Sequence, residues 1–500
     1  MKPVVAVMGA TGYVGGRLVP RLLERGYFVI AISRSMQKLA SRSWARHPSV
    51  QLRAADALEP ASLTSALSGA EVLYYLVHSM EPKVQFEEAD RQAATAVAVA
   101  AENCGVRRIL YLGGLGLENP GLSKHLKSRA EVARLLANGK ASVTTLRAAM
   151  IIGSGSASFE MLRYLVDRLP VMVTPRWVST PSQPIAIRNV LDYLMGCLDH
   201  PETENQTYDI GGSEVLTYRD LMEIYAREAG LRKRWILPVP VFTPKLSSYW
   251  IHLVTPVHAS LARPLAEGLK SPVVCQETRL QDLLQVPLLD CTQAIRLALR
   301  RQLDHDIETH WTDAGRLPPE ESVYPGDPHW SGGTVYQDRR RITVAGSQQD
   351  LWRTILKIGG ETGWYYGNFL WHIRGLMDKL MGGVGSVRGR RDPNSVHVGD
   401  ALDFWRVLAV KPPERLRLVA EMKVPGQAIL EFQVRDLGNG QTEVEQTAWF
   451  VPAGLAGIVY WWLISPLHNL VFSGMLKGIA LASGGQLIKG PEYLPFKPVG

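Results

Sequence analysis

The feature that most constrains this chain is a glycine-rich turn near its start. Residues 4–8 form a short apolar run that leads into Gly9-Ala10-Thr11-Gly12-Tyr13-Val14-Gly15-Gly16, and an amphipathic helical pattern follows. Gly9 suits a tight turn, Gly12 lets the backbone approach a pyrophosphate, and Gly15 lets the helix pack closely on the strand. Glycine turns often serve only to reverse the chain, but a turn set between a strand and a helix predicts a dinucleotide site. The residues expected at its phosphates are Gly9, Thr11, Gly12, Tyr13, Val14 and Gly15.

The rest of the first 150 residues continues this alternation of apolar strands and helices. Further strands are expected at residues 28–33, 50–54, 72–77, 109–112 and 143–146, and helices at 16–25, 86–104 and 124–137. Short connections favour right-handed crossovers, which predicts an α/β fold with a doubly wound parallel sheet of the Rossmann type. Helical patterns at 158–168, 187–198 and 218–229 extend this domain, which we place at residues 1–305.

The end of the second predicted strand indicates which dinucleotide is bound. Sites selective for NAD usually place Asp or Glu there to bind the ribose 2′-hydroxyl, whereas this chain has Ser33 and Arg34. A guanidinium group can neutralise a 2′-phosphate, so we expect NADP(H) in preference to NAD(H). The alternative is a solvated arginine at a strand end. After the third strand, Asp56 and Ala57 lie where a carboxylate either contacts the adenine amino group or caps a helix.

The fourth predicted strand leads into Leu76, Val77 and His78. Ligands of parallel sheets bind outside the carboxyl ends of the strands, so we expect these three residues near the cofactor. His78 is then either a donor to the substrate or a histidine of the loop.

A second domain follows a segment with the composition of a linker. Residues 306–333 are rich in Pro, Gly and acidic residues, which predicts irregular structure. Beyond them, residues 334–500 contain strand-like runs at 340–344, 401–410, 415–422, 428–436 and 441–450, followed by a long apolar segment. This order is typical of a separate α+β domain of antiparallel strands with a C-terminal helix.

The long apolar segment, residues 451–476, contains no Asp, Glu, Lys or Arg and is long enough to cross a membrane. Pro452 and Pro466 bracket its most apolar part, and His468 follows them. We therefore favour a buried or surface-docked helix over a span. Peripheral contact with an inner membrane through this segment is compatible with either function considered below.

The overall composition argues against several other classes of protein. The chain has 500 residues and a formal net charge of +8, with Lys and Arg scattered along it, so no nucleic-acid partner is expected. The four cysteines show no CxxC spacing, which predicts core residues in a reducing compartment and no metal site. The start of the chain lacks the apolar region of a secretory signal, so we expect a cytoplasmic protein.

The glycine turn, Ser33-Arg34 and Asp56 together resemble the atypical short-chain dehydrogenase/reductases, including the NmrA-like branch, over residues 1–300. Residues 158–163, 175–177 and 183–187 resemble a bacterial subgroup in which such a domain is fused to a C-terminal domain of unknown function. The C-terminal part, with its Asp327-Pro-His-Trp-Ser-Gly-Gly333 and Tyr460-Trp461-Trp462 motifs, is similar to that partner domain and to the helix-grip superfamily. Members of that superfamily hold lipids, polyketides or other apolar ligands against a long C-terminal helix, which implies a hydrophobic ligand here.

The resemblance also implies a catalytic pattern from which this chain departs. Dehydrogenases of the family use Tyr-xxx-Lys and an upstream Ser, and the tyrosinate moves the proton. This chain has Gly113 and Gly114 where Ser is expected, and His125-Leu-Lys-Ser-Arg129 where Tyr and Lys should lie. Either His125 shuttles a proton and Arg129 holds the ribose, or both only cap and solvate a helix.

Two further groups of residues are candidates for lining ligands. By family position, Gly153, Gly155 and Phe159 would lie at the nicotinamide end, although the glycines alone indicate only a flexible loop. In the second domain, a cluster on a predicted helix suits a hydrophobic core better than an apolar cavity. Its members are Trp364, Tyr365, Tyr366, Trp371 and His372. If a cavity exists, Trp405, Phe432 and Trp449 on alternating strands would face it.

Two functions fit these observations. The first is an NADP(H)-dependent oxidoreductase that acts on a small hydrophobic substrate, and the second is a non-catalytic NADP(H)-binding sensor whose C-terminal domain binds a lipid or a partner. The absent Tyr and Ser favour the sensor, whereas the complete cofactor loop and the fused domain favour the enzyme. Hydride transfer needs only a bound nicotinamide and an acceptor in reach, so loss of the tyrosine does not exclude redox chemistry.

Overall fold

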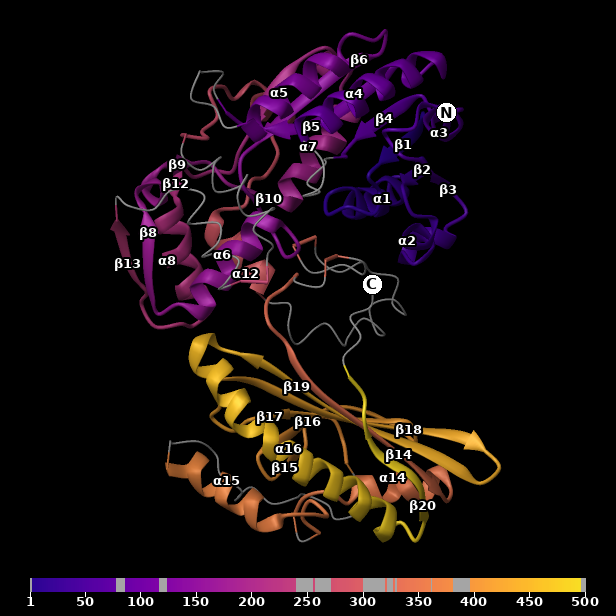
Figure 1. Ribbon diagram of the computed structural model, residues 1–500, viewed down its shortest axis with the longest axis vertical. Helices are drawn as coiled ribbons and strands as arrows, with labels where there is room; N and C mark the ends of the chain where they lie inside the picture. Colours follow the sequence, from indigo (N-terminus) through magenta and orange to yellow (C-terminus); the bar gives the residue numbers. More distant parts are fainter. Residues whose placement is uncertain are drawn as a thin grey trace. The chain divides into compact units, whose positions relative to one another are not determined.

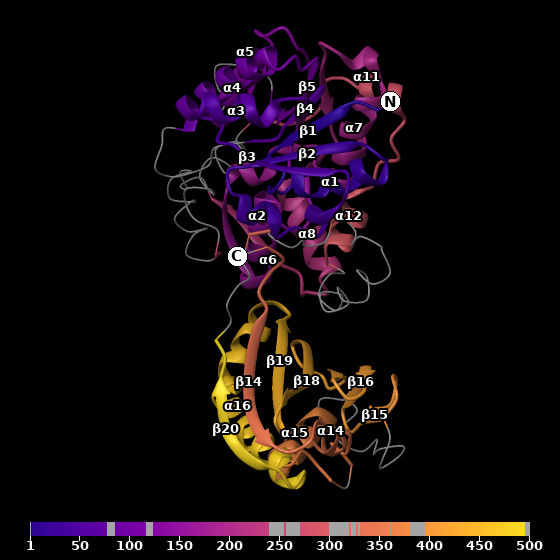
Figure 2. The ribbon, with the colours of Figure 1, turned by 90° about the vertical axis from the view of Figure 1, so that its right-hand side faces the viewer.

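The structure is a computed structural model that describes residues 2–77, 86–116, 124–239, 255–256, 271–299, 320–321, 327–328, 331–360, 362–380 and 396–495. The chain divides into two compact units, Met1–Gly333 and Thr334–Pro498 (Figures 1 and 2). Each unit is described by itself below. Within the described helices, the side chains of His125 and His372 lie outside the described part of the chain.

The first unit is built on a parallel sheet of seven strands in the order β11-β6-β5-β4-β1-β2-β3 (Figure 1). The strands are β1 (Val4–Met8), β2 (Phe28–Ser33), β3 (Val50–Ala54), β4 (Val72–Tyr75), β5 (Arg108–Gly114), β6 (Ser142–Ala148) and β11 (Thr207–Ile210). The order reverses at β1, next to β4, which is the switch point where doubly wound sheets bind ligands. The predicted Rossmann fold is confirmed.

Helices cover both faces of this sheet, because its strands are apolar on both sides. On β1, Val5 and Val7 pack with one set of helices, whereas Ala6 and Met8 pack with the other. The first face is covered by α1 (Gly15–Glu24) and α7 (Ile187–Asp199). The second is covered by α3 (Pro60–Leu67), α4 (Phe86–Asn103) and α5 (Lys124–Leu136).

The remaining elements of the first unit form a smaller lobe with its own core. It contains the strand pairs β7–β10 (Ile151–Ile152, Ile185–Ala186), β8–β13 (Val171–Pro175, Trp235–Val239) and β9–β12 (Pro181–Ser182, Leu216–Thr217). Its helices are α6 (Ala157–Arg168), α8 (Tyr218–Glu228) and α12 (Cys291–Leu299). The first unit also contains two shorter α-helices, α2 (Met36–Ala40) and α11 (Arg279–Leu284).

The second unit is an antiparallel sheet of seven strands in the order β15-β16-β17-β18-β19-β14-β20 (Figure 2). The strands are β14 (Tyr336–Ala345), β15 (Ala401–Leu402), β16 (Trp405–Lys411), β17 (Arg415–Ala420), β18 (Gly426–Gly438), β19 (Gln441–Pro452) and β20 (Gln486–Tyr493). Its helices are α14 (Gln348–Leu356), α15 (Asn368–Leu380) and α16 (Gly454–Ala482), and α16 packs along β19, β14 and β20. The predicted α+β domain with a C-terminal helix is confirmed, and β20 is an addition that the sequence patterns did not indicate.

Two predictions about aromatic residues in this unit are wrong. Trp364, Tyr365 and Tyr366 lie in a turn before α15 rather than on a helix, and Tyr365 takes a φ of 60°. Trp449 is the register partner of Ile429, which lies three residues before Phe432 on β18, so Trp449 lies on the other face of the sheet. Trp405 and Phe432 do share the core of the unit, as does Trp364.

Candidate nucleotide site

The glycine turn between β1 and α1 is tightly packed at two of its glycines. Gly9 takes a φ of 92°, and a Cβ added there would stand 2.8 Å from the carbonyl oxygen of Leu76. A Cβ on Gly15 would stand only 2.3 Å from the carbonyl oxygen of Gly9, and one on Gly12 would stand 3.1 Å from the same atom. This is the close approach of helix to turn that was expected of Gly15. Any side chain at Gly9 or Gly15 would force the turn open.

The start of α1 offers backbone donors to a ligand. The N–H of Gly12 is bonded to the carbonyl of Gly9 at 2.9 Å, which closes the turn. Among the described residues, no backbone carbonyl accepts the N–H of Tyr13 or Val14. These two amides lie at the positive end of the helix dipole, where a pyrophosphate is stabilised. The turn therefore fits a dinucleotide.

The end of β2 lies beside this turn and is basic. The hydroxyls of Thr11 and Ser33 are 2.8 Å apart, and Arg34 follows with an exposed side chain. Arg42, beyond α2, is buried and donates to the carbonyl of Thr11. Burial lowers the pKa of this guanidinium; the carboxylate of Asp327 opposes this shift, and the nearby Arg17 supports it. No Asp or Glu stands between Phe28 and Ala55 in the sequence, so this edge of the turn favours an anion.

Arg42 was missed by sequence analysis, because nothing in the sequence distinguishes it from the solvated arginines around it. It lies eight residues after Arg34 and reaches the glycine turn only because the short helix α2 reverses the chain. Its pattern in the sequence, a lone cation after a helix, is common on protein surfaces.

The other residues expected around the cofactor are placed as follows. Asp56 follows β3, and its Oδ1 accepts the N–H of Leu58 at 3.0 Å, so this oxygen caps a turn ahead of α3. Ala57 is buried beside it. The N–H of Leu76 donates to the carbonyl of Met8 at 3.0 Å, which ties the end of β4 to the end of β1, and Val77 follows. His78 lies outside the described residues.

The end of β5, where the resemblance implies a catalytic Ser, is packed against α5. A Cβ on Gly114 would stand 2.6 Å from a methyl carbon of Leu126, so α5 lies directly on the end of β5. Arg129 donates to the carbonyl of Leu112 at 3.0 Å, and its own carbonyl accepts the hydroxyl of Tyr111 at 3.3 Å. These contacts give Arg129 a structural role in fastening α5 to the sheet. His125 belongs to the first turn of α5, and its side chain lies outside the description.

A buried arginine at the start of α1 is the residue that sequence analysis most clearly overlooked. Arg17 donates from Nε to the carbonyl of Glu320 at 2.8 Å, from Nη1 to that of Tyr13 at 2.9 Å, and from Nη2 to that of Ser154 at 3.0 Å. Asp327 accepts from both terminal nitrogens, at 3.1 and 2.7 Å. The side chains of Arg17 and Asp327 are 0% and 3% exposed. This bidentate pair joins the glycine turn to a segment about 300 residues later in the chain.

The loop after β7 is packed into the same contact. A Cβ on Gly155 would stand 2.7 Å from Oδ2 of Asp327, and one on Gly153 would stand 2.3 Å from the hydroxyl of Tyr13. Phe159 is fully buried, with its ring centroid 6.2 Å from that of Tyr225 in an edge-on arrangement. The expectation that Phe159 lines the nicotinamide end is therefore wrong, because its ring belongs to the core of the smaller lobe.

Several described residues of the segment predicted as a linker are held by contacts with the rest of the first unit. The buried carboxylate of Glu160 accepts the N–H groups of Gly155, Gly332 and Gly333 at 3.0, 2.7 and 3.2 Å. Arg163 lies 3.4 Å from the same carboxylate. Residues 320–321, 327–328 and 331–333 therefore belong to the first unit rather than to a free connection.

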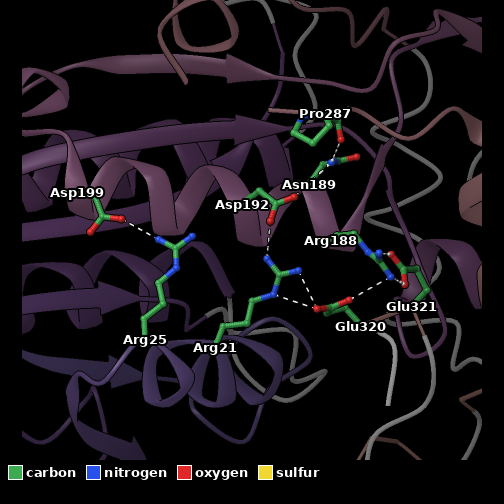
Figure 3. Close-up of polar contacts among 9 residues, drawn as sticks. All are labelled: Arg21, Arg25, Arg188, Asn189, Asp192, Asp199, Pro287, Glu320 and Glu321. Atoms are coloured by element: carbon green, nitrogen blue, oxygen red, sulfur yellow. Dashed lines mark hydrogen bonds and ion pairs between the residues drawn. The ribbon is translucent and has the colours of Figure 1, made fainter. Parts of the chain in front are cut away.

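Charge pairs extend this contact along α1 and α7 (Figure 3). Arg21 lies 2.5 Å from Asp192 on α7 and 2.7 Å from Glu320. Arg188, also on α7, lies 3.3 Å from Glu320 and 2.9 Å from Glu321. Although burial opposes it, the nearby Arg21 and Arg188 hold the pKa of Glu320 below its ordinary value. Arg17 and Arg21, four residues apart on α1, thus bind α7 and the segment that contains Glu320 and Asp327.

Polar groups are also buried in the second unit, between the sheet and α16. Arg340 on β14 pairs with Asp338 at 2.8 Å and donates to Asn469 and Ser473 of α16 at 2.8 and 2.7 Å. Gln446 on β19 is the register partner of Arg340, and it is 1% exposed. Within the described part of the chain, neither amide atom of Gln446 has a hydrogen-bond partner.

Part of each unit matches a known protein family. Residues 9–155 match the family described as NAD(P)H-binding. The first unit carries an NAD(P)H-binding Rossmann domain. The match includes the glycine turn, β2 and the loop after β7, which are the elements that frame the site. Residues 330–475 match a second family, described as a protein of unknown function (DUF2867).

Individual relatives resemble the NAD(P)H-binding domain only distantly. The mitochondrial NADH dehydrogenase [ubiquinone] 1 alpha subcomplex subunit 9 of Arabidopsis thaliana is 26% identical over 250 residues, which cover 48% of this chain and 61% of that protein. The UDP-glucose 4-epimerase of Vibrio cholerae is 21% identical over 278 residues, covering 49% of this chain and 81% of the epimerase. The Citrobacter sp. triphenylmethane reductase in complex with NADP(H) superposes with a TM-score of 0.49 at 21% identity, covering 59% of this chain and 99% of the reductase.

Proposed function

We propose that the chain is an NADP(H)-dependent oxidoreductase that acts on a small hydrophobic substrate. The observation that carries the NADP(H) half of the proposal is the basic edge of the glycine turn. Ser33 and Arg34 end β2 next to Thr11, and Arg42 reaches the same turn from beyond α2. With no carboxylate nearby in the sequence, this edge suits the 2′-phosphate of NADP(H) better than the bare ribose of NAD(H).

NADP(H), when bound, supplies or accepts a hydride, and the protein must then provide for the accompanying proton. The amides of Tyr13 and Val14 would hold the pyrophosphate, and Ser33 and Arg34 would hold the 2′-phosphate. His78 and His125 are the candidates for moving the proton. In the sequence, His78 comes shortly after β4, and His125 belongs to the first turn of α5, which follows β5. The hydrophobic substrate is proposed from the fused domain, whose core between sheet and α16 is rich in aromatic rings.

A second candidate function is a non-catalytic NADP(H) sensor. The observation that favours it is the packing at β5, where Gly114 touches α5 and Arg129 is bonded to the carbonyl of Leu112. In the sequence, Gly113 and Gly114 stand where the family keeps its Ser, and His125 stands where it keeps its Tyr. A sensor would bind NADP(H) without consuming it.

Calorimetric titration of the full chain with NADPH, NADP⁺, NADH and NAD⁺ tests the cofactor. We expect NADP(H) to bind tightly and NAD(H) weakly. Arg34→Glu should weaken NADPH binding about 10- to 100-fold, because a charge-assisted contact to phosphate is lost and a repulsive one gained. NADH binding should change little. The matched control is Lys38→Glu on α2, which reverses an equally exposed charge and should leave both affinities within about threefold.

Three results would contradict the proposal. Equal effects of Arg34→Glu on NADPH and NADH would remove Arg34 from a 2′-phosphate site. Retained binding after Gly12→Val would remove the turn from the phosphate site. Binding of NADPH without its oxidation in a screen of quinones and other apolar acceptors would favour the sensor, and a drop in turnover in His78→Ala or His125→Ala would favour the enzyme.

A further inference from the structure

The outward face of α16 is apolar and exposed over four turns. Its large side chains are Leu455, Val459, Trp462, Leu463, Leu467 and Leu470, which we call the outer stripe. Trp462 is 68% exposed and Leu463 72%, among the highest values for large apolar residues in the described chain. Spacings of three, four and seven residues place these side chains along one side of the helix.

The opposite side of α16 is fully used by the second unit. Its buried side chains are Trp461, Phe472, Met475, Leu476 and Ile479, and the last four belong to the core of the second unit. The helix is nonetheless apolar enough for a bilayer, with a mean hydropathy of 1.4 over an 18-residue window of which 22% is buried. A helix that is apolar all round normally has apolar surroundings on every side. The sheet supplies them for one side only.

The contacts of α16 with the sheet argue against a helix that crosses the membrane. Asn469 and Ser473 hold Arg340, which is paired with Asp338 on the same strand. Crossing a bilayer would drag this ion pair and the strands on which it stands into hydrocarbon, at a cost of several kcal/mol. The inner face must stay on the sheet, and only the outer stripe is left to meet lipid.

The chemistry of the outer stripe suits lipid better than a protein partner. Protein interfaces make about one hydrogen bond per 100–200 Å² and carry a polar rim. Among the exposed side chains of residues 455–470, only Trp462 and Asn469 have polar atoms, and Oδ1 of Asn469 accepts from Arg340. An indole at the boundary of hydrocarbon and water is characteristic of membrane interfaces.

Two exposed lysines lie near the ends of α16. Residues 451–485 contain no Asp or Glu, and Lys477 is exposed in the last turns of α16. Lys423 is exposed in the turn before β18, and this turn touches the start of α16, since a Cβ on Gly457 would stand 2.2 Å from the carbonyl oxygen of Pro425. A cation therefore lies near each end of α16, where it could meet the headgroups of anionic lipids.

We propose that the outer stripe of α16 docks the second unit on the surface of an anionic phospholipid membrane. The helix lies flat, with Trp462 and Leu463 inserted at the level of the upper acyl chains and Lys423 and Lys477 among the phosphates. This inference is independent of the proposed function, because it rests on the second unit alone.

The test is flotation of the full chain with vesicles of phosphatidylcholine and of phosphatidylcholine mixed with phosphatidylglycerol. We expect the chain to float with the mixed vesicles, more strongly at low salt than at high salt. Trp462→Ser combined with Leu463→Ser should weaken partitioning roughly 100-fold, because two inserted side chains lose their transfer free energy. The matched control is Trp235→Ser on β13, where a tryptophan is 69% exposed in the first unit and partitioning should not change.

Several results would overturn the proposal. A chain that floats with neither kind of vesicle does not use the stripe for lipid. Equal flotation of the double variant would place the lipid contact elsewhere. A chain that stays with the aqueous phase and forms a dimer in sedimentation analysis, and whose dimer dissociates in the double variant, would make the stripe a protein interface. The substituted side chains are mainly in solvent, so circular dichroism should show both variants folded.

Discussion

Helices α1 and α16 both pack one face on a sheet, but their outward faces differ sharply. Arg17 and Arg21 on α1 and Arg25 directly after it are spaced four residues apart, and each is paired with a carboxylate. Two of those carboxylates, Asp327 and Glu320, belong to the segment just before the second unit. The outward face of α16 carries leucines and a tryptophan that stay largely exposed. One helix is thus closed by its own chain, whereas the other is left open.

The difference shows how to distinguish a structural face from a binding face. On α1, each arginine that would be costly to bury has at least one carboxylate partner, and all these partners belong to the first unit. On α16, apolar side chains remain in solvent although the same helix contributes to the core of the second unit. Unmatched apolar surface on an otherwise well-packed helix is the stronger indication of a partner.

The largest effect is expected when the buried charge pair of α1 is broken. Asp327→Asn leaves Arg17 buried without its counter-charge, which should destabilise the first unit by about 3–5 kcal/mol. Hydrogen exchange of peptides from β1 and β2 would detect the loss. The matched change Asp199→Asn removes the partner of Arg25, where both side chains are nearly half exposed, and should cost less than about 1 kcal/mol. Similar losses of stability in the two variants would mean that the buried Arg17–Asp327 pair contributes no more than the exposed Arg25–Asp199 pair.

A smaller, pH-dependent effect is expected on the inner face of α16. Burial lowers the pKa of His468 to about 4, although Asp338 opposes this and Arg340 supports it. A histidine whose folded pKa is depressed stabilises the fold above its unfolded pKa and loses that contribution as the pH falls through the interval from 6.5 to about 4. The loss should reach about 3 kcal/mol at the acid end. Unfolding of the second unit followed at pH 7.5 and at pH 4.5 should show it in the native chain and not in His468→Phe, and a flat profile in the native chain would contradict the assignment.

The smallest effect should be a gain in stability. Because neither amide atom of Gln446 is bonded within the described structure, Gln446→Leu should stabilise the second unit by about 1 kcal/mol in denaturant titrations. The matched control is Gln433→Leu on the other face of the sheet, where Nε2 donates to Glu431 at 2.6 Å and a loss is expected. If Gln446→Leu destabilised the unit as much as Gln433→Leu, the amide of Gln446 would have to be bonded in solution.

Much of the fold could be predicted from the sequence because its strands and glycine turns have patterns that can be recognised over a few neighbouring residues. The first three strands were predicted at the residues where β1, β2 and β3 lie, since each is a short apolar run next to a turn. Strand β11 was missed because Thr207–Ile210 is short and contains Asp209, which is buried against Arg147. Trp449 was assigned to the wrong face because its register depends on pairing with β18, which a single strand does not reveal.

The candidate site was predicted only where its residues are close in sequence. The turn from Gly9 to Gly15 carries its own spacing, whereas Arg17 and Asp327 are paired across most of the chain. An acidic, proline-rich stretch is typical of solvated linkers, and nothing local shows that Asp327 and Glu321 have buried counter-charges. Arg42 needed the same long-range information.

The contacts of residues 320–321, 327–328 and 331–333 with the first unit also limit how such a two-part gene can be rearranged. A coding segment that stopped at residue 305 would supply the whole parallel sheet but not Asp327, and the translated product would carry an unneutralised Arg17 beside its nucleotide turn. Recombination that exchanges the second unit must therefore join after Gly333, where the contacts to Glu160 end. A junction after Gly333 keeps the stretch that resembles a spacer together with the nucleotide-binding part.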